Sequence, residues 1–185
     1  MRRRALVGAA VATLLPAARA HGELGPVTPP RALPALKLTL HDGRQLSLQS
    51  LLAGRLTALQ LMFTGCSAVC PVQGAVFAAL QAQVLGALPG AQLLSLSIDP
   101  LNDDARALAA WRQRLGAQPG WVAAAPPLPH GDVMLDALAA RARGSDRHSA
   151  QVVLIDRQGR LAFRCAEFAA PRDIARAMHE LSRLG

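Results

Sequence analysis

The sequence predicts an α/β fold with a mainly parallel central sheet, and three observations support this prediction. Two mostly apolar runs of strand length, residues 56–63 and 92–98, are each followed by a segment with helical periodicity or helix-capping residues. Runs without polar alternation are typical of strands that helices cover on both faces. Strand and helix alternate along the chain, which favours parallel pairing. With 185 residues, 51% of them hydrophobic, the chain is long enough for one folded domain.

The N-terminus has the features of a secretory signal peptide over residues 1–20. A basic start precedes an apolar run, and Ala18-Arg19-Ala20 forms a small-x-small cleavage site. We therefore expect an exported, periplasmic protein. An uncleaved segment that tethers the chain to the inner membrane is the alternative. Residues 21–33 are rich in Pro and Gly without periodicity, which predicts a flexible linker, so the folded domain is expected over residues 34–185.

The folded part is expected to open with a β-hairpin. Residues 36–40 alternate Leu with Lys and Thr, Asp42 and Gly43 follow, and a second short run covers residues 45–48. An Asp-Gly pair between two such runs is a strong signal for a hairpin turn. This hairpin is an N-terminal addition to the central sheet.

Residues 56–63 are then predicted as a central strand that leads into the loop 64–70. Pro71 opens an expected helix over residues 72–88, because Pro is favoured in the first turn of a helix. The second buried strand, residues 92–98, leads to Asn102, Asp103 and Asp104, which are capping residues for the next helix. The further predicted elements are helix 105–115, helix 132–143, strand 151–155, strand 160–165 and helix 171–184. This order is that of a thioredoxin-like fold.

Composition argues against a nucleic-acid partner. The net charge is +8, but four of these charges belong to arginines within the first twenty residues, which leaves +4 for the remainder. Aromatic residues make up 3% of the chain and Tyr is absent, so side chains on which bases could stack are scarce. We expect a monomer without nucleic-acid binding.

Cys66 and Cys70 form a C-x-x-x-C motif between a buried strand and a helix. With Pro71 as the first helical residue, Cys70 would be the cap residue, and its sulfur would face the free N–H groups of the helix, which favours the thiolate. Two thiolates suit Cu(I). A loop-closing disulfide is an alternative, whereas a structural zinc site would need four ligands.

Three segments resemble the Sco/SenC proteins, which deliver copper during cytochrome c oxidase assembly. They are FTGCSAVCP at residues 63–71, LSIDPLNDDARALAAW at 96–111 and RHSAQVVLIDRQGRL at 147–161. The first is similar to the T-x-C-x-x-x-C-P loop of that family, the second to its Asp-Pro turn and following helix, and the third to its His-containing segment. The resemblance extends over about residues 33–184.

The resemblance implies a copper site, Cu(I) or Cu(II), whose ligands are Cys66, Cys70 and His148. The implied function is a metallochaperone whose partner is a membrane-bound copper oxidase subunit or another copper protein. The order of elements also places His148 just before a strand that should lie beside strand 56–63. The alternative is an enzyme, a thiol-disulfide oxidoreductase that uses Cys66 and Cys70 as a redox pair to reduce the cysteines of a partner's copper site.

Other residues depart from that family or have separate predicted roles. Ser67 stands where Pro is common in the family, and Arg147 stands where an acidic residue usually precedes the His. Cys165 alternates with apolar residues and is predicted to be buried and inert. His21 would become the N-terminus after cleavage, where its amine and imidazole could bind Cu(II).

Overall fold

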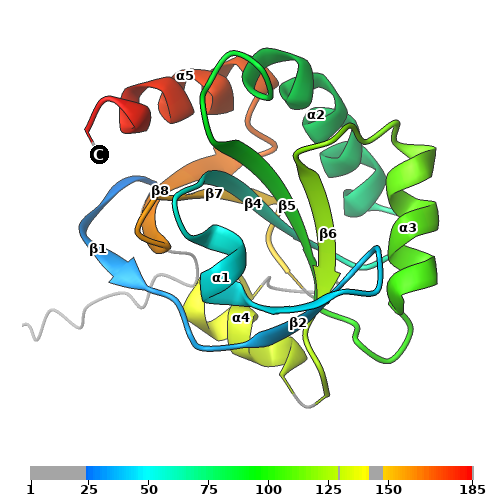
Figure 1. Ribbon diagram of the computed structural model, residues 1–185. Coiled ribbons are helices and arrows are strands. Elements are labelled where there is room, and N and C mark those ends of the chain that lie inside the picture. The colour runs from blue at the N-terminus through cyan, green and yellow to red at the C-terminus, as the bar shows by residue number, and fades with distance from the viewer. Residues whose placement is uncertain (1–23, 129, 142–147, 185) are drawn as a thin grey trace, which may run out of the picture.

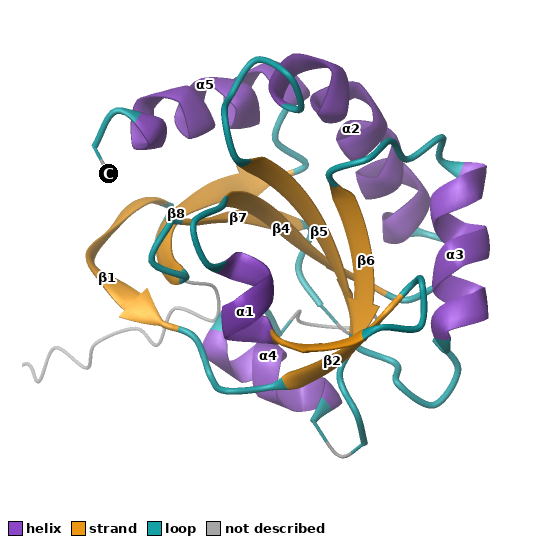
Figure 2. Cartoon of the chain, viewed as in Figure 1, coloured by secondary structure: helices purple, strands orange, loops and turns teal. Residues whose placement is uncertain are grey.

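A computed structural model describes residues 24–128, 130–141 and 148–184. They form one eight-stranded sheet with helices on both faces (Figure 1, Figure 2). The strands are β1 (Gly25–Ala32), β2 (Lys37–Leu40), β3 (Gln45–Ser47), β4 (Leu56–Met62), β5 (Ala91–Ser97), β6 (Trp121–Ala125), β7 (Gln151–Ile155) and β8 (Arg160–Glu167). The helices are α1 (Leu48–Leu52), α2 (Val69–Val84), α3 (Ala105–Arg114), α4 (Gly131–Ala137) and α5 (Pro171–Ser182).

The sheet has the order β1-β8-β7-β4-β5-β6-β2-β3, which confirms the α/β prediction. Parallel pairing is confined to its centre, where β4, β5 and β6 lie side by side. The outer pairs are antiparallel, because β2 with β3 and β7 with β8 are hairpins whose short turns reverse the chain. The sheet is therefore mixed, with the parallel part where sequence predicted it.

Two core layers cover the sheet. Apolar side chains of α2, α3 and α5 pack on one face, and those of α1 and α4 pack on the other. Because both faces are covered, every residue of β4 is buried. This explains why its sequence is mostly apolar instead of alternating, with Thr57 and Gln60 as its two buried polar residues.

The flexible linker predicted over residues 21–33 is wrong for residues 25–32, which form β1 instead. This strand pairs antiparallel with β8, and its register runs from Gly25 opposite Arg164 to Ala32 opposite Arg160. An edge strand tolerates Pro, because the missing N–H can face away from the sheet. The Pro residues that suggested a linker are therefore compatible with this edge. The predicted signal peptide, residues 1–20, lies outside the described residues.

Two further elements were not predicted from sequence. Residues 121–125 form β6, which links the parallel centre to the N-terminal hairpin by pairing with both β5 and β2. The sequence WVAAA is poor in β-branched residues, so the signal for a strand was weak. Helix α1 has five residues, too few for a recognisable period. In the part of the chain that the structure describes, no helix is long and apolar enough to cross a membrane.

Candidate metal centre

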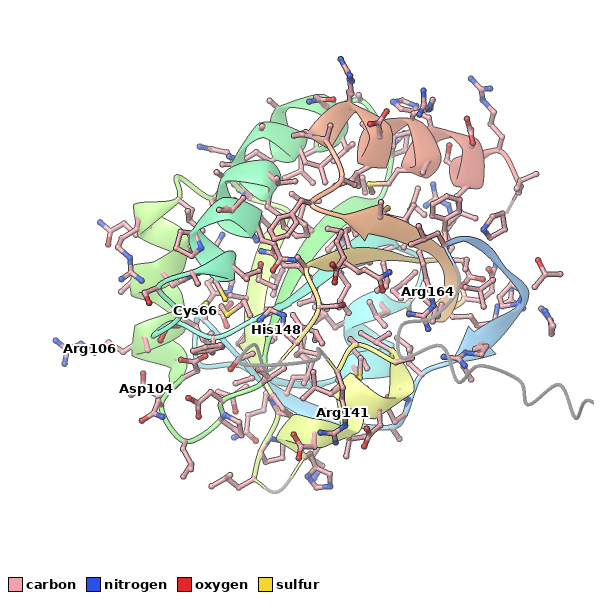
Figure 3. The ribbon with its side chains drawn as sticks, turned by 180° about the vertical axis from the view of Figure 1, so that it is seen from behind. Cys66, Asp104, Arg106, Arg141, His148 and Arg164 are labelled. Carbon is pink, nitrogen blue, oxygen red and sulfur yellow. The ribbon has the colours of Figure 1, made fainter. Side chains whose placement is uncertain are left out.

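The site lies at the end of the sheet where β4, β5 and β6 finish. Cys66 is in the loop that follows β4, and Cys70 is in the first turn of α2. His148 precedes β7, which runs antiparallel to β4, so the start of β7 lies beside the end of β4. Figure 3 shows Cys66 and His148 close together at this end. The fold therefore brings together the three side chains that the sequence singled out.

The predicted start of the helix, and with it the predicted role of Cys70, is wrong. Helix α2 begins at Val69 with Ala68 as its cap residue, so Cys70 is the second helical residue. Pro71 is the third, a position that Pro tolerates because first-turn N–H groups have no partner within the helix. The sulfur at the helix end belongs to Cys66, which accepts a hydrogen bond from the Cys70 backbone N–H at 3.4 Å.

The two thiols have different environments. Partial burial opposes ionisation of Cys66, but hydrogen bonds from the Cys70 thiol and from the backbone N–H groups of Cys70, Ala68 and Val69 outweigh it and lower the pKa of Cys66. Burial, followed by the hydrogen bond to Cys66, raises the pKa of Cys70 to about 12. Both cysteines are free thiols. The pair therefore consists of an accessible thiol that ionises readily and a buried one that stays protonated.

His148 is 3% exposed, and its Nε2 lies 3.8 Å from the Cys70 Sγ. Its Nδ1 lies 2.9 Å from the Ser149 carbonyl oxygen. A carbonyl only accepts hydrogen bonds, so Nδ1 carries the proton and donates. In the neutral imidazole, Nε2 is then the acceptor nitrogen, and it faces Cys70. The Phe63 ring packs against the imidazole in an edge-to-face arrangement, with 6.3 Å between ring centroids.

The spacing of His148 and Cys70 suits a shared metal ion. Metal bonds of about 2.3 Å to sulfur and about 2.0 Å to nitrogen, at a trigonal angle, place these two atoms about 3.7 Å apart. The observed distance is 3.8 Å. Among the residues that the structure describes, however, no group of three or more His, Cys, Asp or Glu side chains is already assembled around one point. Coordination by all three residues therefore requires a rearrangement of side chains within the site.

A carboxylate near the cysteine loop was not recognised from sequence as part of this region. Asp103 is 2% exposed and accepts hydrogen bonds from Thr64 and Ser97. Sequence marked Asp103 only as one of three candidate capping residues. The cap of α3 is its neighbour Asp104, which accepts from the Ala107 N–H at 2.7 Å. Because Asp104 alone is enough to cap α3, the presence of a second acidic residue, Asp103, was the one sequence feature that indicated a separate role.

The other residues singled out from the sequence are Cys165, His21 and Arg147. Cys165 is in β8 and 5% exposed, as predicted, and burial raises the pKa of its thiol to about 12. His21 and Arg147 lie outside the described residues.

Fold and site together define a thioredoxin-like domain with a cysteine pair and a histidine at one end of its sheet. The family model described as SCO1/SenC matches residues 28–119. The chain belongs to the SCO1/SenC family. No curated relative matches the chain.

Solved structures of the family share the fold. A SCO1/SenC family lipoprotein from Bacillus anthracis is 24% identical, with a TM-score of 0.72, and the match covers 85% of this chain and 97% of that one. Yeast Sco1 with copper bound is 14% identical, with a TM-score of 0.70 and coverage of 83% and 90%. BsSco, described with a disulfide switch and as a member of the Sco family of cytochrome c oxidase assembly proteins, is 19% identical, with a TM-score of 0.72 and coverage of 85% and 96%.

Proposed function

We propose that this protein binds copper through Cys66, Cys70 and His148 and delivers it to a partner copper protein. The observation that carries the proposal is the buried contact of 3.8 Å between the His148 Nε2 and the Cys70 Sγ, with the Nδ1 of the same ring held by the Ser149 carbonyl. Two thiolates and one imidazole form a soft ligand set that suits Cu(I) and also accepts Cu(II). Copper bound to yeast Sco1, which has the same fold, supports the choice of metal.

Copper binding must overcome the resistance of Cys70 to ionisation. The ligand is the thiolate, and the Cys70 thiol has a pKa of about 12. A bound metal ion deprotonates a coordinating thiol outright, because its positive charge replaces the missing solvation. Cys66, with its lowered pKa and partial exposure, is the thiol that an incoming ion meets ready to bind.

The proposed recipient is a membrane-bound copper oxidase subunit or another copper protein. BsSco is described as a member of a family of cytochrome c oxidase assembly proteins, which supports an oxidase. The residues 1–20 have the pattern of a signal peptide, and the Bacillus anthracis relative is described as a lipoprotein. We therefore place the protein outside the cytoplasm, in the periplasm, either released or tethered by its N-terminal segment.

The test is copper binding by the purified, reduced protein, measured by metal analysis, visible spectroscopy and competition with a Cu(I) chelator. His148→Ala should weaken copper affinity by more than about 100-fold, since loss of groups that merely orient a metal ligand already costs about 10–100-fold. The control is His179→Ala, which removes an imidazole from α5. Equal affinity in wild type and His148→Ala would show that His148 is not a ligand.

A second candidate function, thiol-disulfide oxidoreductase, is favoured by the difference between the two thiols. The Cys66 thiolate would attack a partner's disulfide and release one partner sulfur as a thiolate. Cys70 would then attack Cys66, which frees the second partner sulfur and leaves a Cys66–Cys70 disulfide. The disulfide switch described for BsSco supports this alternative. His148→Ala separates the two functions, because disulfide exchange needs only the two sulfurs and should remain nearly intact.

A further inference from the structure

Asp103 is a buried carboxylate whose hydrogen bonds join two segments near the site. Thr64 donates to it through its backbone N–H, at 3.1 Å to each carboxylate oxygen, and through its hydroxyl at 2.5 Å. Ser97, the last residue of β5, donates its hydroxyl at 2.6 Å. Hydrogen bonds to a charged acceptor are about twice as strong as those between neutral groups. The carboxylate is therefore a firm link between the end of β5 and the cysteine loop.

Thr64 stands two residues before Cys66, and the turn between them is short. The Cys66 backbone N–H donates to the Phe63 carbonyl at 3.1 Å, so residues 63–66 form a closed turn. A displacement of Thr64 would move both ends of this turn. Phe63 packs on the His148 ring, and the Cys66 sulfur accepts the hydrogen bond from Cys70. A shift of Thr64 would therefore change the positions of all three proposed ligands relative to one another.

We propose that Asp103 is a positioning residue of the copper site, which holds Thr64 in place and thereby sets how Cys66 lies relative to Cys70 and His148. The copper part of this inference rests on the proposed function. Asp103 contacts the loop and not the metal, so it acts through Thr64. This also assigns a purpose to the Thr of the T-x-C-x-x-x-C-P motif, whose hydroxyl serves as the loop's attachment point.

The hydrogen bonds of Asp103 point to a role in the loop and not in the helix that follows it. The cap of α3 is already supplied by Asp104, so Asp103 is not needed to begin that helix. Its buried carboxylate accepts hydrogen bonds from Thr64 in the cysteine loop and from Ser97 at the end of β5. Asp103 therefore joins the loop to the sheet.

The experiment compares four variants of the full chain, one of them a control. Thr64→Val removes the hydroxyl but keeps the shape of the side chain and the charge of Asp103. Thr64→Ser keeps the hydroxyl and should restore the wild-type behaviour. Asp103→Asn removes the charge and leaves an amide that cannot accept all the hydrogen bonds. Asp104→Ala is the control, because it removes the cap of α3 and destabilises the protein without touching Thr64 or Ser97.

Two readings are taken for each variant. The first is Cu(I) affinity by chelator competition. The second, free of metal, is the equilibrium of the Cys66–Cys70 disulfide plus two glutathione molecules with the dithiol plus glutathione disulfide. We expect Thr64→Val and Asp103→Asn to weaken copper binding on the order of tenfold, and to shift the glutathione equilibrium toward the dithiol. Thr64→Ser and Asp104→Ala should match wild type in both readings.

The outcomes separate this inference from the proposed function. If wild type fails to bind copper but Thr64→Val still shifts the glutathione equilibrium, the positioning role stands and the copper function falls. If Thr64→Val equals wild type in both readings, the positioning role is overturned. Tighter copper binding in Asp103→Asn with Thr64→Val unchanged would mean that Asp103 acts through its charge alone, which also overturns it. Equal losses in Asp104→Ala would reduce the effect to general stability.

Discussion

Cys66 and Cys70 are four residues apart, yet the fold gives them opposite acidities. The Cys66 sulfur accepts hydrogen bonds from several backbone N–H groups at the start of α2. Cys70, in contrast, is 1% exposed and lies among apolar side chains. A helix that begins at Pro71, as the sequence predicts, would put the sulfur of Cys70 at the helix end. A shift of two residues in the start of α2 exchanges the roles of the two sulfurs.

This difference predicts the order in which the thiols react. In the reduced protein, Cys66 should be alkylated by iodoacetamide at a pH below that needed for an ordinary thiol, since the thiolate is the nucleophile. Cys70 should stay unmodified until the protein unfolds, because it is buried and its pKa is about 12. Mass spectrometry of peptides after alkylation from pH 6 to pH 9 measures both rates. Faster modification of Cys70 than of Cys66 would contradict the assignment.

Cys165 predicts a dependence of stability on alkaline pH. Its pKa is raised from 9.0 to about 12 in the folded protein. Between these values the unfolded chain loses the proton and the folded chain retains it, so the free energy of unfolding falls as pH rises. The slope for one such group is at most about 1.4 kcal/mol per pH unit. Cys165→Ala should remove this contribution, leaving a shallower decline from pH 8.5 to pH 10.5.

Denaturant titrations of wild type and Cys165→Ala over that range provide the measurement. The composition favours this measurement. The chain has no Tyr and a single Lys, so few other groups titrate between pH 8.5 and pH 10.5. Cys70 is also raised to about 12 and should keep part of the decline in the variant. Parallel stability curves for the two proteins would refute the contribution of Cys165.

Among the elements, β1 has the clearest experimental consequence. It covers the edge of β8 through four register pairs, and each such pair contributes about 0.2–1 kcal/mol. Removal of residues 1–32 should therefore lower the free energy of unfolding by about 1–4 kcal/mol, and the exposed β8 edge should promote self-association. Removal of residues 1–23 leaves β1 in place and serves as the control. Thermal melts and light scattering would report both effects, and identical behaviour of the two truncations would restore the linker interpretation.

The elements also show what the sequence can and cannot predict. Strands β4, β5 and β7 were predicted because burial on both faces leaves an apolar run that is hard to mistake. The prediction failed for β1, whose Pro residues are tolerated only because it lies at an edge. Whether a strand lies at an edge depends on the order of the strands in the whole sheet. The local sequence of β1 does not show that order.

The candidate site, like the fold, was predictable from the sequence only in part. Cys66 and Cys70 stand in one short motif, and the pairing of β7 with β4 was enough to place His148 near them. Asp103 was missed because it stands between two other capping candidates, and which of the three faces inward depends on the turn after β5. Its partners Thr64 and Ser97 are 39 and 6 residues away along the chain, and only folding brings them together.

For the whole molecule, copper binding should raise thermal stability. A ligand that binds only the folded state at 100 times its dissociation constant contributes about 2.7 kcal/mol. For a chain of this size, that corresponds to a rise in melting temperature of about 5–10 °C. Differential scanning calorimetry of the reduced protein with and without Cu(I) tests this, and Cys70→Ser should abolish the rise. A rise retained in Cys70→Ser would place the copper elsewhere on the chain.

The unequal exposure of the two sulfurs fixes the order in which an incoming group forms bonds within the site. Of the proposed ligands, only Cys66 is more than a few per cent accessible, whereas Cys70 and His148 are 1% and 3% exposed. An electrophile, an ion or the thiol of another protein arriving from solvent therefore makes its first bond at Cys66. By microscopic reversibility, a group that leaves the site follows the same route backwards. The bond to Cys66 is therefore the first to form on entry and the last to break on departure.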